Sequence, residues 1–168
     1  DIIEETNYGD RPDGDGPRIQ EGDFVRAQIT SVARDSIAVV VGGVDTRVSL
    51  HALTFEYLVD ARTKYKVGQE IMVQVEQIIK EKDGHHIVEV NCKQPELERA
   101  KQMRSALPIG SIVFGIVSSV AASKKQPGNI NVLAYIKMYD LPVLVNNMPA
   151  KFLGSEPPRG STVRLKVL

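Results

Sequence analysis

Two segments of this chain share the pattern of a glycine followed by an alternating strand. Residues 21–32 read EGDFVRAQITSV, and residues 109–120 read IGSIVFGIVSSV. Aligning the two glycines also superposes a Val, a Ser and a second Val. Alternation of apolar and polar residues is typical of a strand with one buried face and one wet face. A repeated strand opener predicts two copies of a small β domain.

The composition of the 168 residues argues against several classes of protein. The only cysteine, Cys92, excludes an internal disulfide framework and cysteine-rich metal sites, and we expect a buried thiol in a cytoplasmic protein. No apolar run approaches the roughly 20 residues that a transmembrane helix needs, so no membrane partner is expected. The acidic N-terminus does not have the pattern of a signal peptide. Because the chain does not begin with Met, we expect a fragment or a processed product.

Charge is distributed unevenly, although the net charge is zero. Residues 1–20 carry a charge of −4, residues 21–93 carry −2, and residues 94–168 carry +6. The first segment is rich in Gly, Pro and Asp and is expected to be a flexible linker. The basic second half indicates either a surface for an anionic partner such as RNA or an ordinary solvated face.

The first copy of the pattern predicts five strands with a helical insert. The strand at 21–32 is followed by apolar strands at 37–41 and 46–50, which the glycines at 42 and 43 separate. Further strands are expected at 70–80 and 85–91, with an Asp-Gly turn between them. Between the third and fourth strands, Leu53, Tyr57, Leu58 and Ala61 have helical spacing and predict a short helix or helical turn.

The second copy follows the same plan after a helix predicted at 95–107. Strands are expected at 110–120, 131–139, 141–145 and 159–168, but the copy has no return strand of its own. Either the chain was cut inside the domain, or another segment fills the gap, and the Ile2-Ile3 pair is one candidate. The predicted fold is therefore mainly β, with two small five-stranded OB-type Greek-key barrels joined by a short α-helix. The expected segments are a linker at 1–20, a barrel at 21–93, a helix at 94–107 and a degenerate, incomplete barrel at 108–168.

The ordered set of motifs resembles the RNA-binding repeat of ribosomal small-subunit protein one. The motifs are the glycine-opened strand at 22–32, the glycine-flanked strand at 35–43, LHAL at 50–53, KVGQEIMVQV at 66–75 with its hairpin, and NCK at 91–93. The resemblance covers residues 21–93, and residues 108–168 less closely. It implies single-stranded RNA (or DNA) as a partner, bound by aromatic stacking on the second and third strands with basic residues around them.

The sequence departs from this family at the binding face. The second strand is aliphatic, and the third has Arg47 and Ser49 where the family has an aromatic residue and a histidine. In the second copy, Phe114 occupies the outward position of Arg26, and Tyr135, Lys137 and Tyr139 are expected to alternate along one strand face; the alternative is that both tyrosines face the core. The candidate RNA-binding residues are Arg26, Arg47, His51, Arg62, Lys64, Lys101, Arg104, Phe114, Tyr135, Lys137, Tyr139 and Arg164.

Nothing in the sequence indicates catalysis, a metal or a cofactor. There is no Ser-His-Asp set, phosphate loop or pair of carboxylates on a defined scaffold, and the His85-His86 pair has no spaced ligand partner. We therefore predict a non-enzymatic tandem that binds single-stranded RNA, mainly through the second copy and the joining helix. The rival hypothesis is a protein-interaction or scaffold module, for instance on the ribosome or a larger assembly, that has lost the nucleic-acid platform. A third is an accessory domain of a larger nuclease or translation factor.

Overall fold

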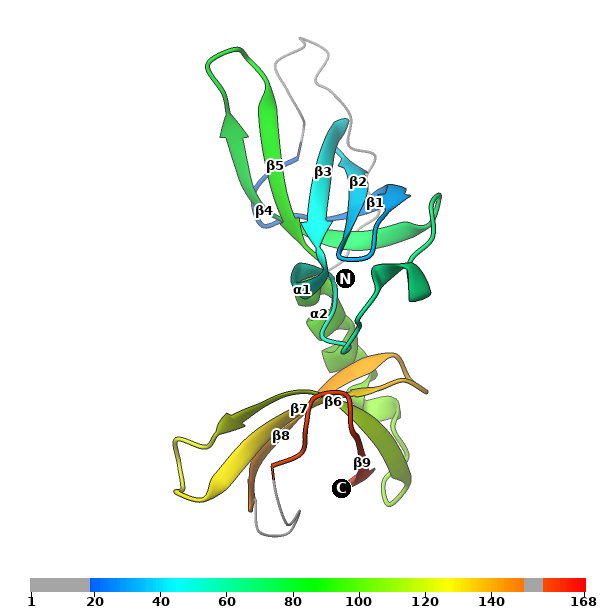
Figure 1. Ribbon diagram of the computed structural model, residues 1–168, viewed down its shortest axis with the longest axis vertical. Coiled ribbons are helices and arrows are strands. Elements are labelled where there is room, and N and C mark those ends of the chain that lie inside the picture. Colours follow the sequence, from blue (N-terminus) through cyan, green and yellow to red (C-terminus); the bar gives the residue numbers. More distant parts are fainter. Residues whose placement is uncertain (1–18, 150–155) are drawn as a thin grey trace. The chain divides into compact units, whose positions relative to one another are not determined.

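The computed structural model describes residues 19–149 and 156–168, and Figure 1 shows its strands and helices. The described chain divides into two compact units. Unit 1 comprises residues 19–54 and 58–95, and unit 2 comprises residues 55–57, 96–149 and 156–168. The Ile2-Ile3 pair, considered above as a filler for the second copy, lies outside the described residues.

Unit 1 is a five-stranded antiparallel sheet that curls into a nearly closed barrel. Its strands are β1 (Phe24–Val32), β2 (Ser36–Val41), β3 (Val44–Ser49), β4 (Glu70–Lys80) and β5 (His86–Asn91), in the order β3-β2-β1-β4-β5. The outer strands β3 and β5 lie against each other, and the Thr46 hydroxyl donates a hydrogen bond of 2.6 Å to the Val88 carbonyl. The five strands predicted for the first copy are confirmed.

The alternation of the opening strand determines which side chains enter the barrel core. Val25, Ala27 and Ile29 are buried, whereas Arg26 and Gln28 are exposed. Aliphatic side chains from the other strands complete the core, and so does Ile19, which the sequence analysis placed in the linker. Cys92 is buried, as expected.

The helical insert is two short turns instead of one helix. These are α1 (Leu50–Leu53) and the 3-10 turn η1 (Ala61–Thr63). The Asp60 side chain caps η1 by accepting a hydrogen bond from the Arg62 backbone N–H, so the second turn has its own start signal. The predicted helical turn between the third and fourth strands is confirmed, but Tyr57, which the helical spacing included, lies in neither α1 nor η1.

A longer helix, α2 (Lys93–Met103), follows β5 and ends in the 3-10 turn η2 (Arg104–Ala106). It begins two residues earlier than the helix predicted from Pro95. No helix within 19–149 and 156–168 is long and apolar enough to cross a membrane.

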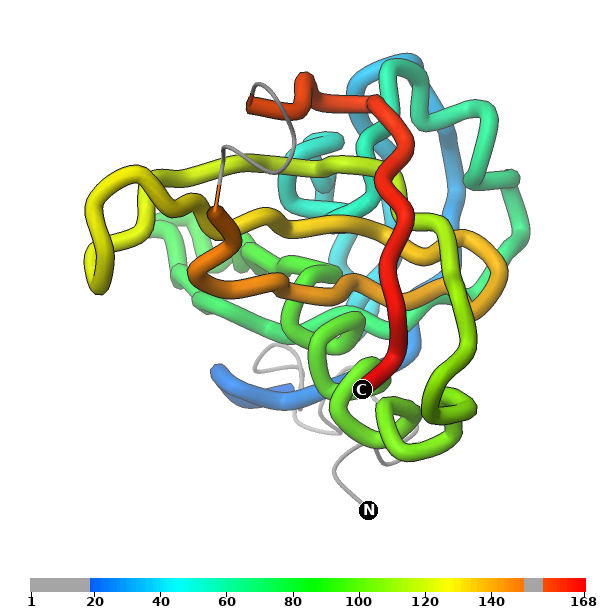
Figure 2. Tube along the Cα trace, turned by 90° about the horizontal axis from the view of Figure 1, so that it is seen from below, coloured from blue at the N-terminus to red at the C-terminus, as the bar shows by residue number. Residues whose placement is uncertain are grey.

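Unit 2 contains a four-stranded antiparallel sheet. Its strands are β6 (Ile112–Ala122), β7 (Asn129–Ile136), β8 (Leu141–Pro149) and β9 (Thr162–Lys166), in the order β8-β7-β6-β9. Figure 2 shows the red trace of β9, which pairs with β6. The prediction that the second strand runs to Tyr139 is wrong: it ends at Ile136, and residues 137–140 form a turn. A second OB barrel stays a prediction, because the described part of unit 2 supplies four strands.

The sheet of unit 2 repeats the register of β1 to β4 pair by pair. Strand β1 pairs with β2 and β4, with a bulge between Ile29 and Ser31, and β6 pairs with β7 and β9, with a bulge between Val117 and Ser119. The β2–β3 pairs from 37↔48 to 41↔44 correspond in turn to the β7–β8 pairs from 132↔145 to 136↔141. The sequence repeat is therefore also a repeat of strand pairing.

Closure of unit 1 can be tested at the hydrogen bond from the Thr46 hydroxyl on β3 to the Val88 carbonyl on β5. Thr46→Val keeps the side-chain shape but leaves the Val88 carbonyl without this donor, so the free energy of unfolding should fall by about 1 kcal/mol. Chemical denaturation of the full chain measures the change. Thr162→Val, at an exposed strand position of unit 2, is the matched control and should have little effect. Equal effects of the two substitutions would contradict this role of Thr46.

Candidate nucleic-acid interface

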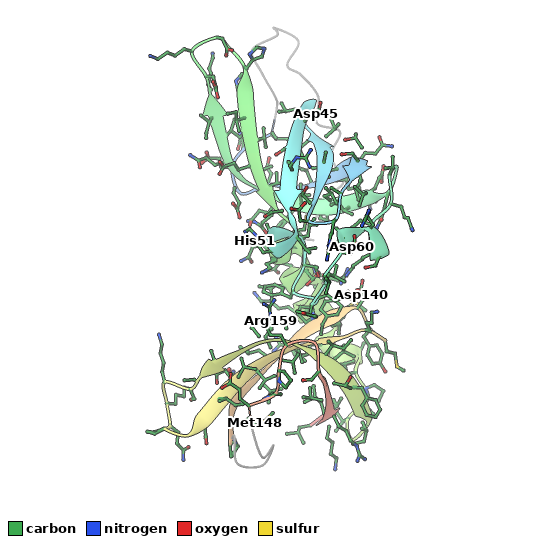
Figure 3. All side chains as sticks on the ribbon, in the orientation of Figure 1. Asp45, His51, Asp60, Asp140, Met148 and Arg159 are labelled. Atoms are coloured by element: carbon green, nitrogen blue, oxygen red, sulfur yellow. The ribbon has the colours of Figure 1, made fainter. Side chains whose placement is uncertain are left out.

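A small polar cluster occupies the outward face of β2 and β3 in unit 1. The Arg47 Nη1 donates a hydrogen bond of 2.8 Å to the Ser36 Oγ, and Ser36 is the cross-strand partner of Ser49. The Ser49 Oγ lies 3.1 Å from the Nδ1 of His51, which is exposed on α1 (Figure 3). We call these four residues, Ser36, Arg47, Ser49 and His51, the β2–β3 polar cluster.

The turn between β1 and β2 connects this cluster to η1. The Arg34 carbonyl accepts a hydrogen bond of 2.7 Å from the Ala61 N–H, and the Asp35 carbonyl accepts one of 2.8 Å from the Leu50 N–H. Both helical turns of the insert are thereby fixed against the strand turn. The candidate residues on α1 and η1 are consequently held at the same end of the sheet as the β2–β3 polar cluster.

Arg62 is engaged by a neighbouring carboxylate. Its Nη2 and Nε donate hydrogen bonds of 2.7 Å and 2.9 Å to the two oxygens of Asp60. These side-chain hydrogen bonds, followed by the one from the Arg62 backbone N–H, lower the pKa of Asp60 from 3.8 to about 2. The charge of Arg34 lowers the Asp60 pKa further. Asp60 therefore stays ionised at neutral pH and competes with any anion for Arg62.

Arg34 is a basic residue of this face that the sequence analysis missed as a candidate. It is exposed on the β1–β2 turn, and its effect on Asp60 places its charge near η1. Its position in a polar turn triplet, Arg34-Asp35-Ser36, hid it, because such triplets are common in loops without a ligand. Lys64 adds a half-buried cation beyond η1, with its Nζ 6.0 Å from the centre of the Tyr65 ring.

Arg26 lies on β1, which pairs with β2, but toward the opposite end of that pairing from Ser36. It is exposed, as predicted, and its Nη1 is 3.6 Å from a carboxylate oxygen of Glu70 on β4. In unit 2 the equivalent pair of positions holds Phe114 and Thr162 with no carboxylate. Phe114 is 62% exposed and is the cross-strand partner of the exposed Arg164.

Tyr135 cannot stack a base in this structure, which corrects the prediction. Its side chain is fully buried, and its hydroxyl donates a hydrogen bond to the Asp140 carboxylate. Arg99 on α2 bonds the Asp140 carbonyl and lies 3.3 Å from its carboxylate. Burial raises the pKa of Tyr135, and the Asp140 bond adds to the effect. The alternative that this tyrosine is a packing residue is therefore the correct one.

The remaining candidates are spread over the turn and the helix of unit 2. Lys137 lies in the turn after β7, with its Nζ 3.9 Å from a carboxylate oxygen of Glu56, and Tyr139 is half-buried in the same turn. Lys101 is exposed near the end of α2, 3.3 Å from a carboxylate oxygen of Glu98, and Arg104 is exposed in η2. The expected alternating face of Tyr135, Lys137 and Tyr139 is not formed.

The geometry of unit 1 suits binding of an anionic strand. Arg34, Arg47, Arg62 and Lys64 supply cations along one end of the sheet, beside Asp35 and Asp60. The outward positions of β2 and β3 hold no aromatic residue, so stacking there would rest on the planar guanidinium of Arg47. Among the described residues, no group of three or more His, Cys, Asp or Glu side chains could hold a metal ion.

Comparisons with known proteins agree with this picture for part of the chain. Residues 18–86 match the family model of the S1 RNA binding domain. No curated protein matches the sequence. A solved structure of the cytoplasmic molybdate-binding protein ModG, with molybdate bound, shares 13% identity and covers 89% of this chain and 93% of that one. The TM-score of this match is 0.25, which is too low to show a shared fold.

The Asp60–Arg62 pair gives a prediction on pH. Arg62→Gln removes the charged donor, so the pKa of Asp60 should rise from about 2 toward 3.8. Because the folded-state pKa is the lowered one, the stabilisation that this pair gives is present above pH 3.8 and is lost as the pH falls toward 2. Carboxyl carbon NMR shifts measure the titration. Arg164→Gln in unit 2 should leave the Asp60 pKa unchanged, and an unchanged pKa in Arg62→Gln would contradict the assignment.

Proposed function

The chain carries one S1 RNA-binding domain at residues 18–86, and we propose that the protein binds single-stranded RNA through the outward face of β2 and β3 in this domain. The observation that supports the proposal most directly is the family match over the unit that exposes Arg47 and His51 on this face. The proposed function is binding without catalysis.

Arg47 is the side chain best suited to contact the RNA. Its hydrogen-bond partner is the neutral Ser36, so the full positive charge of the guanidinium is available to a phosphate. The planar guanidinium group can also stack on a base, and the imidazole ring of His51 adds a second planar group beyond Ser49. By contrast, Arg62 and Arg26 each lie beside a carboxylate that offsets their charge.

The equivalent face of unit 2 is a poorer candidate. By register, Leu144 takes the position of Arg47, and the buried Tyr135 takes the position of Val40. No cation stands at either place. The main contact is therefore proposed on the first copy, whereas the sequence alone favoured the second copy and the joining helix.

The contribution of Arg47 can be measured with a labelled single-stranded RNA of about 12 nucleotides, within the range of sites that OB folds occupy. The logarithm of affinity should fall linearly with the logarithm of salt concentration. Arg47→Ala should weaken binding and make that slope shallower by about 0.7, the value of one phosphate contact to a single strand. An affinity that does not depend on salt would refute the proposal.

Arg47→Lys is the matched control because it keeps the charge and loses the planar group. If Arg47 contacts phosphate alone, the lysine variant should bind as the wild type does. If Arg47 also stacks on a base, the lysine variant should keep the slope but bind more weakly at every salt concentration. Thermal melts of both variants exclude loss of the fold as the cause.

A second candidate function, protein interaction by addition of a strand, is favoured by the open edge of unit 2. In unit 1, Val73 and Val75 on β4 are fully buried inside the barrel that β5 closes. Their register equivalents in unit 2, Leu165 and Val167, are half-buried, and β9 ends the sheet of the described residues. Sheet edges of this kind accept strands from partners.

The open edge can be tested with a strand that this chain already contains. Replacing Leu168 by a copy of residues 76–91 places the hairpin and β5 at the register that they have in unit 1. Backbone amides of β8 and β9 should then exchange more slowly, and the melting temperature should rise. The control carries Asp at the copies of Val88 and Val90, the two buried valines of β5. Equal exchange in the two proteins would argue against a strand-accepting edge.

A further inference from the structure

The outward face of β6 and β9 combines apolar and basic side chains on a flat pair of strands. The cross-strand pairs are Ile112↔Lys166, Phe114↔Arg164 and Ile116↔Thr162. Phe114 is 62% exposed and Ile112 is 43% exposed, and both basic side chains are exposed. None of these six positions holds an acid. We call Phe114, Arg164 and Lys166 the β6–β9 patch.

The exposure of Phe114 is imposed by the packing of the strand and not by a loose loop. Val113 and Val117 point into the core of unit 2 and are buried. Between them, a Cβ on Gly115 would lie 2.9 Å from the Cβ of Ala134, which shows how closely β6 and β7 approach there. Since side chains alternate along a strand, Phe114 must face outward. The sheet thus holds a phenyl ring in solvent, which burial energetics alone disfavours.

Comparison with unit 1 shows what is particular to this face. At the equivalent positions unit 1 has Arg26 for Phe114, Met72 for Arg164 and Gln74 for Lys166, and Glu70 stands where unit 2 has Thr162. Unit 1 has its aromatic residue, Phe24, at the position of Ile112, whereas unit 2 has its ring at the middle pair of positions. There the ring lies beside two cations, and unit 2 lacks the acid that pairs with Arg26. The net change is from a neutral face to one of charge +2.

We propose that the β6–β9 patch is a second contact for single-stranded nucleic acid, with a base stacked on Phe114 and phosphates bound by Arg164 and Lys166. The proposal rests on the function proposed above, because it takes the ligand class from the S1 domain. A phenyl ring accepts any base face, and cross-strand neighbours are about 5 Å apart, which suits one nucleotide. A protein partner for this apolar face would need acidic groups for both cations, and single-stranded nucleic acid supplies base and phosphate together.

The absence of tryptophan from the chain allows a direct test. Phe114→Trp in the full chain gives a single tryptophan, whose fluorescence can be excited apart from that of the tyrosines. A single-stranded RNA of about 20 nucleotides, longer than one OB-fold site, should quench it through stacking. Leu144→Trp, at an outward position of similar exposure (58%) on β8, should not be quenched. A double-stranded RNA of the same length should not quench either variant, since its bases are paired. Equal quenching at both positions, or none at Phe114→Trp, would overturn the proposal.

Affinity measurements separate this contact from the proposed function of unit 1. Loss of one stacked base costs about 1–3 kcal/mol, so Phe114→Ala should weaken binding of the 20-nucleotide strand by about 5-fold to 150-fold. Phe114→Leu should weaken it nearly as much, because leucine keeps the apolar surface and loses the ring. Wild-type affinity in both variants, together with weak binding by Arg47→Ala, would reject the β6–β9 patch and leave the S1 contact standing. Failure of the wild type to bind would reject both. Full binding by the leucine variant, with weak binding by Phe114→Ala, would show that the contact needs apolar surface and no ring, and would overturn base stacking on Phe114.

Discussion

The fold of both units depends on a pair of backbone hydrogen bonds at a glycine with positive φ. In unit 1, the Gly22 N–H donates to the Val75 carbonyl at 2.7 Å, and the Val75 N–H donates to the Asp23 carbonyl at 2.9 Å. Gly22 has a φ of 91°, which a residue with a side chain adopts only at a cost. The bonds fix the register of β1 against β4. A slip of one residue would turn Arg26 into the core and Val25 into solvent.

Unit 2 keeps the same bonds with different side chains. The Gly110 N–H donates to the Val167 carbonyl at 2.7 Å, and the Val167 N–H donates to the Ser111 carbonyl at 3.0 Å. Because the backbone alone defines the register, the inward positions must stay small or aliphatic and the outward positions are free to change. A face with Arg26 in one unit and Phe114 in the other follows from this freedom. The structural repeat and the difference in surface chemistry thus have one origin.

Features set by local sequence were predictable, and features set by distant contacts were not. Glycine spacing and alternation were enough for the five strands of unit 1 and for the exposure of Phe114, since period and turn chemistry act over a few residues. The burial of Tyr135 could not be predicted in this way. It depends on Asp140, at the end of the turn after β7, and on Arg99 from α2, more than 30 residues away. The place of Tyr57 in the insert after β3 was misread for the same kind of reason. The helical spacing crosses from unit 1 to residues that pack in unit 2.

The groups beside each basic residue decide which of these residues can bind an anionic ligand. Charge counts assigned −2 to residues 21–93 and favoured the second half, but a count does not show where each carboxylate lies. In the structure, Asp60 holds Arg62 with two short hydrogen bonds, and a phosphate at Arg62 would also meet the charge of Asp60. Arg47 has only the hydroxyl of Ser36 to replace, and an exchange of one neutral bond for a charge-assisted one is favourable. Phosphate binding on unit 1 should therefore be concentrated at Arg47 despite the negative charge of the unit, because the field close to a site is set by its immediate neighbours.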